Sequence, residues 1–230
     1  MIIRSEKIKF LILRTIGNFL VLTSILGMIA TFGPAIKNEG IYRLNRFRGV
    51  IYLLAGDLSP PVGGSGQAKR GFFADILGAP TLKILTPVDS NFSIVIPKIA
   101  ANARIIPNVN PSNYNEYMQA LSSGVAHARG TVFPGMRGNI FLFAHSTDNF
   151  WNVGRYNAVF YLLKELEPGD EVNIFFGGKR FIYLVYDKKI VDAGEVGYLT
   201  SGTDSQTLTL QTCWPPGTTW KRLLVLAKID

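Results

Sequence analysis

The sequence predicts a mainly β-sheet protein: a closed barrel or a sandwich, preceded by one membrane-spanning helix. From about Asn91 onward, short apolar runs alternate with turn-forming residues, and only two stretches look helical. Many short strands with few helices are typical of a barrel or a sandwich. Near the N-terminus, one long apolar run contains no charge. The β-rich part, residues 91–230, is long enough to bury one hydrophobic core.

The apolar run, Ile16–Ile36, has 21 residues without a charged side chain. As a helix it would be about 31 Å long and would cross the roughly 30 Å hydrocarbon core of a bilayer. A cleaved signal peptide is the alternative. Its apolar core is usually about 7–15 residues long and ends in a small-x-small motif. Ala30-Thr31-Phe32 and Gly33-Pro34-Ala35 match that motif poorly, so we favour an uncleaved transmembrane signal anchor.

The charges that flank the run predict its orientation. Residues 1–15 form a basic tail, with Arg4, Lys7, Lys9 and Arg14 against Glu6. By the positive-inside rule this tail stays in the cytoplasm, and the domain lies on the other side of a single-pass cell-membrane anchor. Residues 1–50 hold +6 of the chain's net charge of +8. The basic excess therefore belongs beside the membrane and is not spread over a domain face, which argues against nucleic acid as a partner.

Residues 37–90 are expected to form a juxtamembrane segment and linker. Within them, Ile41–Leu54 is both basic and apolar, which suits a helix that lies on the bilayer surface. Residues 59–67 are rich in Pro, Gly and Ser, a composition typical of a flexible spacer.

Within residues 91–230, apolar runs bounded by turn formers predict the strands. In chain order these are Phe92–Ile96, Arg104–Ile106, Asn139–His145, Glu171–Phe176, Arg180–Val191, Thr207–Thr212 and Leu223–Ile229. Helical signals predict Pro111–Leu121, with Ser112 as its N-cap, and Tyr156–Leu166, which ends before Pro168-Gly169-Asp170. The segment Gly124–Thr131 has more of the character of a loop than of a strand.

Cys213 is the only cysteine of the chain, so no internal disulfide can form. An unpaired cysteine in an exported protein is buried, intermolecular or reactive. The strand Thr207–Thr212 delivers Cys213 at its C-terminal end, and Arg222 opens the next apolar run nine residues later. A lone cysteine is more often a small buried hydrophobe than a nucleophile. The exported setting and the placement at a strand end favour the reactive interpretation here.

Acyl chemistry on a thiol requires a proton-transfer partner and a group that stabilises an oxyanion. His145 ends an apolar strand and so belongs to the rim of the domain, as Cys213 does, while Arg222 is a permanent cation near the same rim. The second histidine, His127, lies in the loop-like segment. No metal is expected, because two histidines and one thiol lack metal-ligand spacing. No nucleotide-binding, serine-hydrolase or zincin motif occurs, and no cofactor is expected.

The chain resembles the sortase family over roughly Phe92–Ile229. The resemblance rests on Thr209-Leu210-Gln211-Thr212-Cys213, on Arg222 nine residues later, and on the upstream segment from Gly124–Thr131 to Ala144-His145. It implies a closed eight-stranded β-barrel and a cysteine transpeptidase. By position, Cys213 matches the nucleophile, His145 the general acid and base, and Arg222 the residue that holds substrate and oxyanion. Thr212 matches the substrate-binding threonine beside the nucleophile, and His127 matches a recurrent position without a catalytic role.

The same resemblance implies the partners. An exported protein would present a C-terminal LPxTG-like sorting signal, and an amine of a peptidoglycan precursor or of a pilin lysine would accept its acyl group. Three departures argue against pilus assembly and leave the subclass and the sorting motif open. No second apolar span follows Leu223, residues 55–90 lack an Asp-Pro-aromatic lid motif, and Ser146 follows the histidine where arginine is frequent.

Two other functions are compatible with this pattern. One is a membrane-anchored module that binds peptides on the same barrel without cleaving them. The other is an exported Cys/His transpeptidase that acts on cell-wall crosslinks, but its S-x-G-C-x-R motif is absent.

Overall fold

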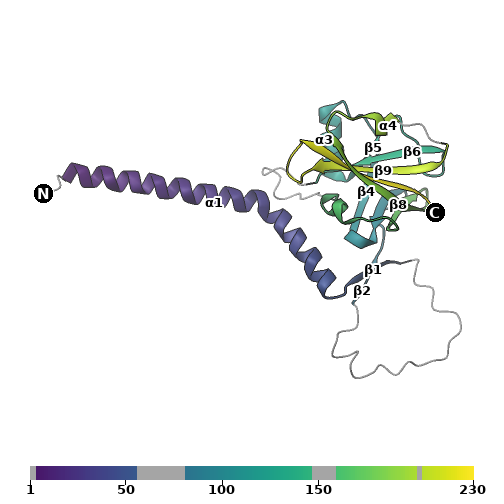
Figure 1. Ribbon diagram of the computed structural model, residues 1–230, viewed down its shortest axis with the longest axis horizontal. Coiled ribbons are helices and arrows are strands. Elements are labelled where there is room, and N and C mark those ends of the chain that lie inside the picture. Colours follow the sequence, from purple (N-terminus) through teal and green to yellow (C-terminus); the bar gives the residue numbers. More distant parts are fainter. Residues whose placement is uncertain (1–3, 56–80, 147–158, 201–203) are drawn as a thin grey trace, which may run out of the picture.

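A computed structural model describes residues 4–55, 81–146, 159–200 and 204–230 (Figure 1). A long N-terminal helix leads into a small two-stranded sheet, and a β-barrel follows. The barrel strands are β3 (Phe92–Ile96), β4 (Ala101–Val109), β5 (Val125–Ala128), β6 (Gly138–Phe143), β7 (Glu171–Phe176), β8 (Lys179–Asp192), β9 (Gln206–Trp214) and β10 (Lys221–Ile229).

The eight strands close in the order β10-β8-β7-β3-β4-β5-β6-β9, which confirms the predicted barrel. Most neighbours are antiparallel, but β4 pairs parallel with β5, and β6 pairs parallel with β9. Strand β9 therefore lies between β6 on one side and β10 on the other, and β10 runs antiparallel to it. Closure leaves no exposed sheet edge in the barrel.

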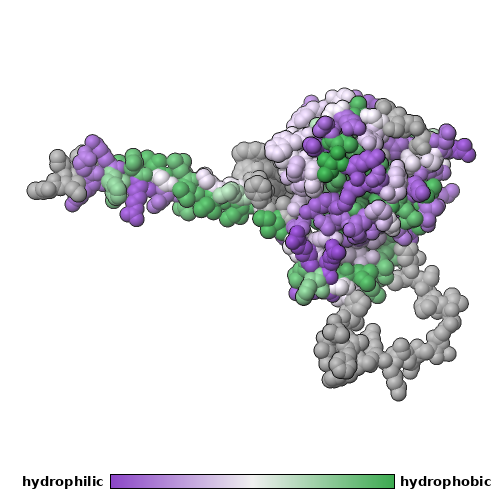
Figure 2. Space-filling model, in the orientation of Figure 1, coloured by the Kyte–Doolittle hydropathy of each residue, from purple (hydrophilic) through white to green (hydrophobic). Residues whose placement is uncertain are grey.

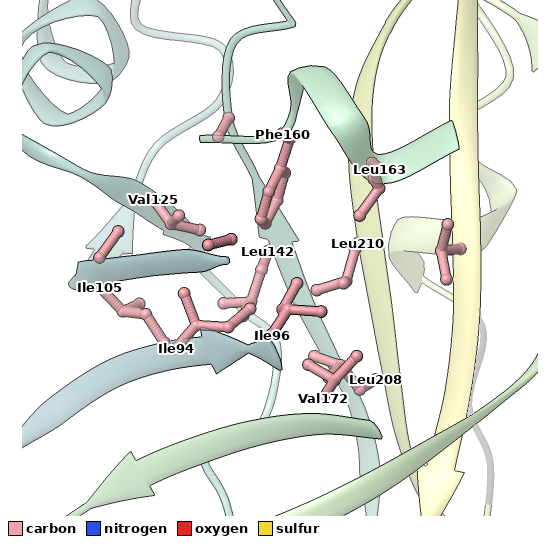
Figure 3. Close-up of a cluster of buried hydrophobic side chains, with 14 of the residues drawn as sticks. Ile94, Ile96, Ile105, Val125, Leu142, Phe160, Leu163, Val172, Leu208 and Leu210 are labelled. Atoms are coloured by element: carbon pink, nitrogen blue, oxygen red, sulfur yellow. The ribbon is translucent and has the colours of Figure 1, made fainter. Parts of the chain in front are cut away.

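Alternation along each strand fills the barrel with aliphatic side chains. In β9, Leu208 and Leu210 point inward and lie opposite Ala227 and Val225 of β10. Figure 3 shows such side chains from several strands converging, with Phe160 and Leu163 closing one side of the cluster. Each fully buried Leu or Ile contributes about 1.5–3 kcal/mol of transfer free energy. The barrel interior is thus a packed core, and a binding site must lie outside it.

A second, smaller apolar cluster lies on the outer face of the barrel. It consists of Val191, Leu224 and Leu226, and Tyr198 of the short helix α4 (Gly197–Thr200) packs against it. In β10, Leu224 and Leu226 occupy the positions that alternate with the inward-facing ones, so this strand is apolar on both faces. The outer surface of β9 and β10 is therefore partly covered by the segment that connects β8 to β9.

Helix α3 (Tyr114–Ser123) connects β4 to β5. It begins later than predicted, because Asn113 and not Ser112 caps it: the Asn113 side chain accepts a hydrogen bond from the amide of Glu116 at 3.2 Å. The helix ends at Gly124, where the chain runs so close to β4 that a Cβ atom would lie 2.2 Å from the Arg104 carbonyl oxygen. Only glycine permits this approach without displacing the backbone.

The N-terminal helix α1 (Arg4–Phe47) is longer than the predicted anchor and bends along its length (Figure 1). Within the described residues, one stretch, Glu6–Ala30, is long and apolar enough to span a membrane. Pro34 lacks an amide hydrogen for the helical ladder, which accounts for a bend. A salt bridge of 3.0 Å from Lys164 to Glu39 joins the second part of α1 to the barrel.

Several local expectations differ from the structure. Val125–Ala128, expected to be loop, is the fully buried strand β5, because its small and apolar residues fit between β4 and β6. Ile41–Leu54 is helical only to Phe47. Its end, Ile51–Leu54, is strand β1, which pairs with the unpredicted strand β2 (Leu82–Leu85).

The second predicted helix is a short 3-10 helix, η3 (Tyr161–Glu165), in the described residues, and another, η1 (Pro97–Ile99), joins β3 to β4. The spacer predicted at 59–67 and the start of the helix predicted at Tyr156–Leu166 lie outside the described residues.

Candidate active site

The β9–β10 pairing brings Cys213 and Arg222 together. The two strands are antiparallel, and their register sets Cys213 directly opposite Arg222. Directly opposed residues of an antiparallel pair point to the same face, with Cβ atoms about 4.5–5.5 Å apart. A short hairpin connection, Pro215–Trp220, allows residues nine positions apart to meet in this way.

The β6–β9 pairing adds His145 on the other side of Cys213. The last register pair of this parallel ladder is Phe143 with Gln211, and the amide of Ala144 continues the ladder by donating to the Gln211 carbonyl at 3.1 Å. His145 stands two residues beyond Phe143, and Cys213 stands two residues beyond Gln211. Strand β6 ends at Phe143, and a continued period of two would set His145 level with Cys213 and on the same face.

Cys213 and Arg222 thus form a row across β9 and β10, and the chain that leaves β6 continues to His145 on the other side of Cys213. The core-facing positions of these strands are the ones that alternate with the row, such as Leu142 and Leu210, so the row lies on the outer face of the barrel. All three side chains are half-buried. A thiol that is accessible beside an imidazole and a guanidinium can react with a bound carbonyl.

Arg222 is held by its own hairpin. Its Nη1 donates to the carbonyl oxygens of Thr219 and Lys221, at 3.0 Å each. Among the described residues, no carboxylate lies within salt-bridge distance of the guanidinium, and neither Nε nor Nη2 makes a hydrogen bond. The guanidinium keeps donors for an incoming oxygen atom, as oxyanion stabilisation needs.

Comparison with known proteins agrees with this geometry. A family model described as the sortase domain matches residues 94–230, more than half of the chain.

The chain belongs to the sortase family.

Sortase D of Bacillus subtilis strain 168 is 28% identical over 136 residues, which cover 58% of this chain and 60% of that protein. Among solved structures, sortase C-1 from Actinomyces oris has a TM-score of 0.51 at 26% identity, covering 62% of this chain and 75% of that one. The pilus-related sortase C of Group B Streptococcus has the same TM-score and identity, covering 61% and 66%. The family match begins at Ile94, so α1, β1 and β2 lie outside it.

The side chain of Thr212, predicted to bind substrate, points into the core of this sortase and away from Cys213. Its side chain is 3% exposed on the core face, and its hydroxyl donates to the Ala144 carbonyl at 2.9 Å. This bond joins the residue before Cys213 to the residue before His145. The threonine is therefore placed to hold the two strand ends together.

Tyr117 is a site neighbour that the sequence reasoning missed. The C-terminal end of β6 pairs with the beginning of β5, which α3 precedes, so α3 lies at the rim that carries the row. Tyr117 is half-buried against the core. Burial, then the nearby Tyr114 and Cys213, raise the pKa of the Tyr117 hydroxyl, while Arg222 lowers it. Tyr117 precedes the buried Ala120 and Leu121 by three and four residues, so the helical spacing in the sequence could have predicted that Tyr117 faces the barrel.

His127 lies away from the row and is fully buried. Its Nδ1 accepts a hydrogen bond from the amide of Asn108 at 3.3 Å, so Nε2 carries the proton and donates to the Val132 carbonyl at 3.1 Å. The ring also packs against Phe133, with centroids 4.6 Å apart. Burial lowers the pKa of His127. These contacts hold the His127 ring within the packed core.

The outer face also holds a cavity of about 470 Å³ on the surface of β6, β8, β9 and β10. Thr207 and Thr209 donate to the Asn139 side-chain oxygen at 3.2 and 3.1 Å, and the Asn139 amide donates to the Tyr198 carbonyl at 3.0 Å. These bonds attach α4 to the face that carries Cys213. Among the described residues, no group of three or more His, Cys, Asp or Glu side chains is suited to hold a metal.

Proposed function

We propose that this sortase is a membrane-anchored cysteine transpeptidase. In this proposal it cleaves an LPxTG-like sorting signal, retains the acyl group as a thioester on Cys213, and transfers it to an amine of the cell envelope. The observation that supports the proposal is the strand register: Arg222 lies opposite Cys213, and β6, which pairs with β9, ends two residues before His145. Membership of the sortase family supports the same chemistry.

The first half-reaction forms the thioester. The Cys213 sulfur attacks the Thr–Gly carbonyl carbon as His145 takes the thiol proton, and the carbonyl oxygen gains negative charge. Arg222 donates hydrogen bonds to that oxygen. Collapse of the intermediate breaks the C–N bond, and His145 returns the proton to the leaving amine. Removing a single oxyanion donor typically costs about 10²–10³ in kcat.

The second half-reaction reverses these roles. An amine attacks the thioester carbonyl, His145 accepts the proton of the amine, and the Cys213 sulfur leaves and is reprotonated. The acceptor is an amine of a peptidoglycan precursor or a pilin lysine. A relative described as pilus-related is known in Group B Streptococcus. The departures at Ser146 and in residues 55–90 favour the peptidoglycan acceptor here.

The topology of the proposal follows from the N-terminal helix. Residues 1–15 are cytoplasmic, 16–36 cross the membrane, 37–90 connect, and 91–230 form the extracytoplasmic catalytic barrel. The apolar stretch Glu6–Ala30 supports the anchor, since the exposed side chains of this part of α1 have no protein partner to cover them among the described residues. The substrates are then other exported proteins that carry a C-terminal sorting signal.

The test is intact-mass analysis of the full-length protein, in detergent, after incubation with LPxTG-type peptides and a glycine-based amine. We expect an acyl adduct on the wild-type protein that the amine releases as a ligated product. Cys213→Ala should form no adduct, while His145→Ala and Arg222→Ala should lose nearly all turnover. Circular dichroism of each variant checks that it is folded. A folded wild-type protein that forms neither adduct nor product with a broad peptide panel contradicts the proposal.

The same samples separate the catalytically silent binding module from the enzyme. A binding module would bind a peptide with equal affinity in wild type and in Cys213→Ala, without covalent product. Resistance of Cys213 to thiol reagents in the folded protein would favour that alternative, because a nucleophile has to be accessible.

A further inference from the structure

The second part of α1, residues 36–47, has two different faces. One face is turned inward: Glu39 bonds to Lys164 of the barrel domain at 3.0 Å, and Asn45 donates to the hydroxyl of Tyr52, on β1, at 3.1 Å. Tyr42 is half-buried on the same side. Lys164 lowers the pKa of Glu39, the largest influence on that carboxyl. These contacts fix the rotation of the helix about its own axis.

The opposite face carries an apolar stripe that is largely exposed among the described residues. Its members are Ile36, Leu44 and Phe47, which are 69%, 45% and 91% exposed. At 100° per residue, these three fall within about 80° of one another, and Glu39 and Asn45 lie outside that arc. Ile41 lies nearer to Asn45 and faces the cavity between α1 and the barrel, so it is not part of the stripe. The space-filling view shows that the hydrophobic surface of α1 continues from its N-terminal part toward the barrel (Figure 2). We call Ile36, Leu44 and Phe47 the juxtamembrane stripe.

Basic side chains border the juxtamembrane stripe. Lys37, Arg43 and Arg48 are exposed on its side of the helix. The only acidic residue between positions 36 and 54, Glu39, is engaged by Lys164 and by Arg43, at 3.0 and 2.8 Å. An apolar stripe edged by cations matches a bilayer interface that contains anionic lipid.

The position of the stripe along the chain favours the membrane, and not a protein partner, as the surface that covers it. Ile36 is the last residue of the proposed span, residues 16–36, and the stripe continues from it to Phe47, 11 residues or about 16 Å of helix further on. The stripe therefore starts where the span leaves the hydrocarbon core and enters the headgroup layer, which is about 5–8 Å thick. The bend of α1 lets the part after it run obliquely to the span (Figure 1). Basic residues on the exported side oppose the positive-inside tendency, and contact with anionic headgroups accounts for their presence there.

We propose that the juxtamembrane stripe lies in the outer headgroup layer of a bilayer that contains anionic lipid and holds the barrel at a fixed height and orientation. This inference rests on the proposed membrane anchor. It adds a second contact with the membrane, beyond the span, and this contact is made by a helix that is rigidly attached to the catalytic barrel. The active-site row would then meet membrane-attached partners at a constant distance from the bilayer.

The test uses the full-length chain in lipid nanodiscs, with Cys213→Ala as the background and one new cysteine that carries an environment-sensitive fluorophore. The labelled variants are Phe47→Cys in the stripe, Val21→Cys in the span and Tyr114→Cys on the barrel, at the far end of β4 from η1. The discs contain a lipid with a nitroxide quencher near the top of its acyl chain. They are made from phosphatidylcholine alone or mixed with phosphatidylglycerol.

With phosphatidylglycerol present, we expect at least about a two-fold loss of fluorescence at position 47, a similar loss at 21 and none at 114. Reversing the border charges with Lys37→Glu and Arg48→Glu should reduce the loss at 47 and leave that at 21 unchanged. The matched control, Arg137→Glu with Lys179→Glu on the exposed barrel surface, should change neither.

The outcomes separate the two proposals. No quenching at 21 contradicts the anchor itself. Quenching at 21 without quenching at 47 overturns the stripe proposal alone, and so does equal quenching at 47 in both lipid mixtures. A label at 47 that is shielded from water without being quenched by lipid, and only at high protein density, would assign the stripe to a second copy of the chain and likewise overturn the proposal.

Discussion

Replacing Thr212 by valine tests whether the core-facing hydroxyl positions the active-site row. Valine keeps the shape of the side chain but removes the 2.9 Å hydrogen bond to the Ala144 carbonyl, at a position that is 3% exposed. The loss of one buried hydrogen bond of this kind costs about 1–2 kcal/mol. For a domain of about 140 residues, this corresponds to a fall in Tm of roughly 3–8 °C.

The effect on activity should exceed the effect on stability. The lost bond joins the residue before Cys213 to the residue before His145, so the strand ends that carry the thiol and the imidazole gain freedom to separate. Misplacement of catalytic groups by about 1 Å can cost 10²-fold in rate. We expect kcat/KM for an LPxTG-type peptide to fall at least about ten-fold in Thr212→Val, with the fall in kcat rather than in KM.

Two control variants make the result interpretable. Thr212→Ser retains the hydroxyl and should recover most of the activity. Ser93→Ala removes another buried hydroxyl, which donates to the Asp89 carbonyl. Ser93 lies on β3, a strand that adjoins neither β6, β9 nor β10. This variant should lose similar stability with normal kcat/KM. If Thr212→Val and Ser93→Ala lose stability and activity in the same proportion, Thr212 has no positioning role. A rise in KM alone would instead support direct binding of substrate by Thr212.

Three further predictions follow from particular contacts. Tyr117→Phe should lower kcat/KM by about 3–10-fold with an unchanged Tm, because it removes only a hydroxyl near enough to Cys213 and Arg222 for them to influence its pKa. An equal effect from Tyr114→Phe, at an exposed position, would contradict this. His127 has a pKa below its ordinary value of about 6.5, so the unfolded chain binds a proton more readily, and stability should be complete above about pH 7 and fall as the pH drops through 6.5. The Tm measured between pH 8 and pH 5 should show this fall, and the Tm of His127→Gln should depend less on pH. If the pH dependence of Tm is unchanged in that variant, the fall belongs to other groups. Gly124→Ala should lower the free energy of unfolding in urea by about 2–4 kcal/mol, because its Cβ would meet the Arg104 carbonyl. Gly194→Ala, with open space around it, should change it by no more than about 0.5 kcal/mol, and equal losses in the two variants would refute the steric argument.

Much of the fold could be predicted because most of its strands are recognisable from the residues within them. Phe92–Ile96 and Glu171–Phe176 match β3 and β7 residue for residue, since each is an apolar or alternating run bounded by turn formers. The segment Val125–Ala128 was misjudged as loop because its alanines and histidine carry little strand propensity. It is a strand because β4 and β6 bury it on both sides. The pair β1–β2 was missed because neither short run has a partner nearby in sequence.

For the candidate site, too, local sequence features predicted some properties and long-range strand pairing decided the others. The sequence by itself determined which residues have the chemistry: one thiol, one imidazole at the end of an apolar strand, and one guanidinium nine residues after the thiol. These depend on residue type and on local spacing. Only the tertiary structure decided that the strand before His145, distant in sequence, pairs with the strand that carries Cys213, because that depends on the register of the parallel β6–β9 pair. It also decided that the Thr212 hydroxyl faces the core and that α3 brings Tyr117 to the same rim. Closing the barrel sets which strands are neighbours and in which register, and such long-range pairing leaves no signal in any short stretch of the chain.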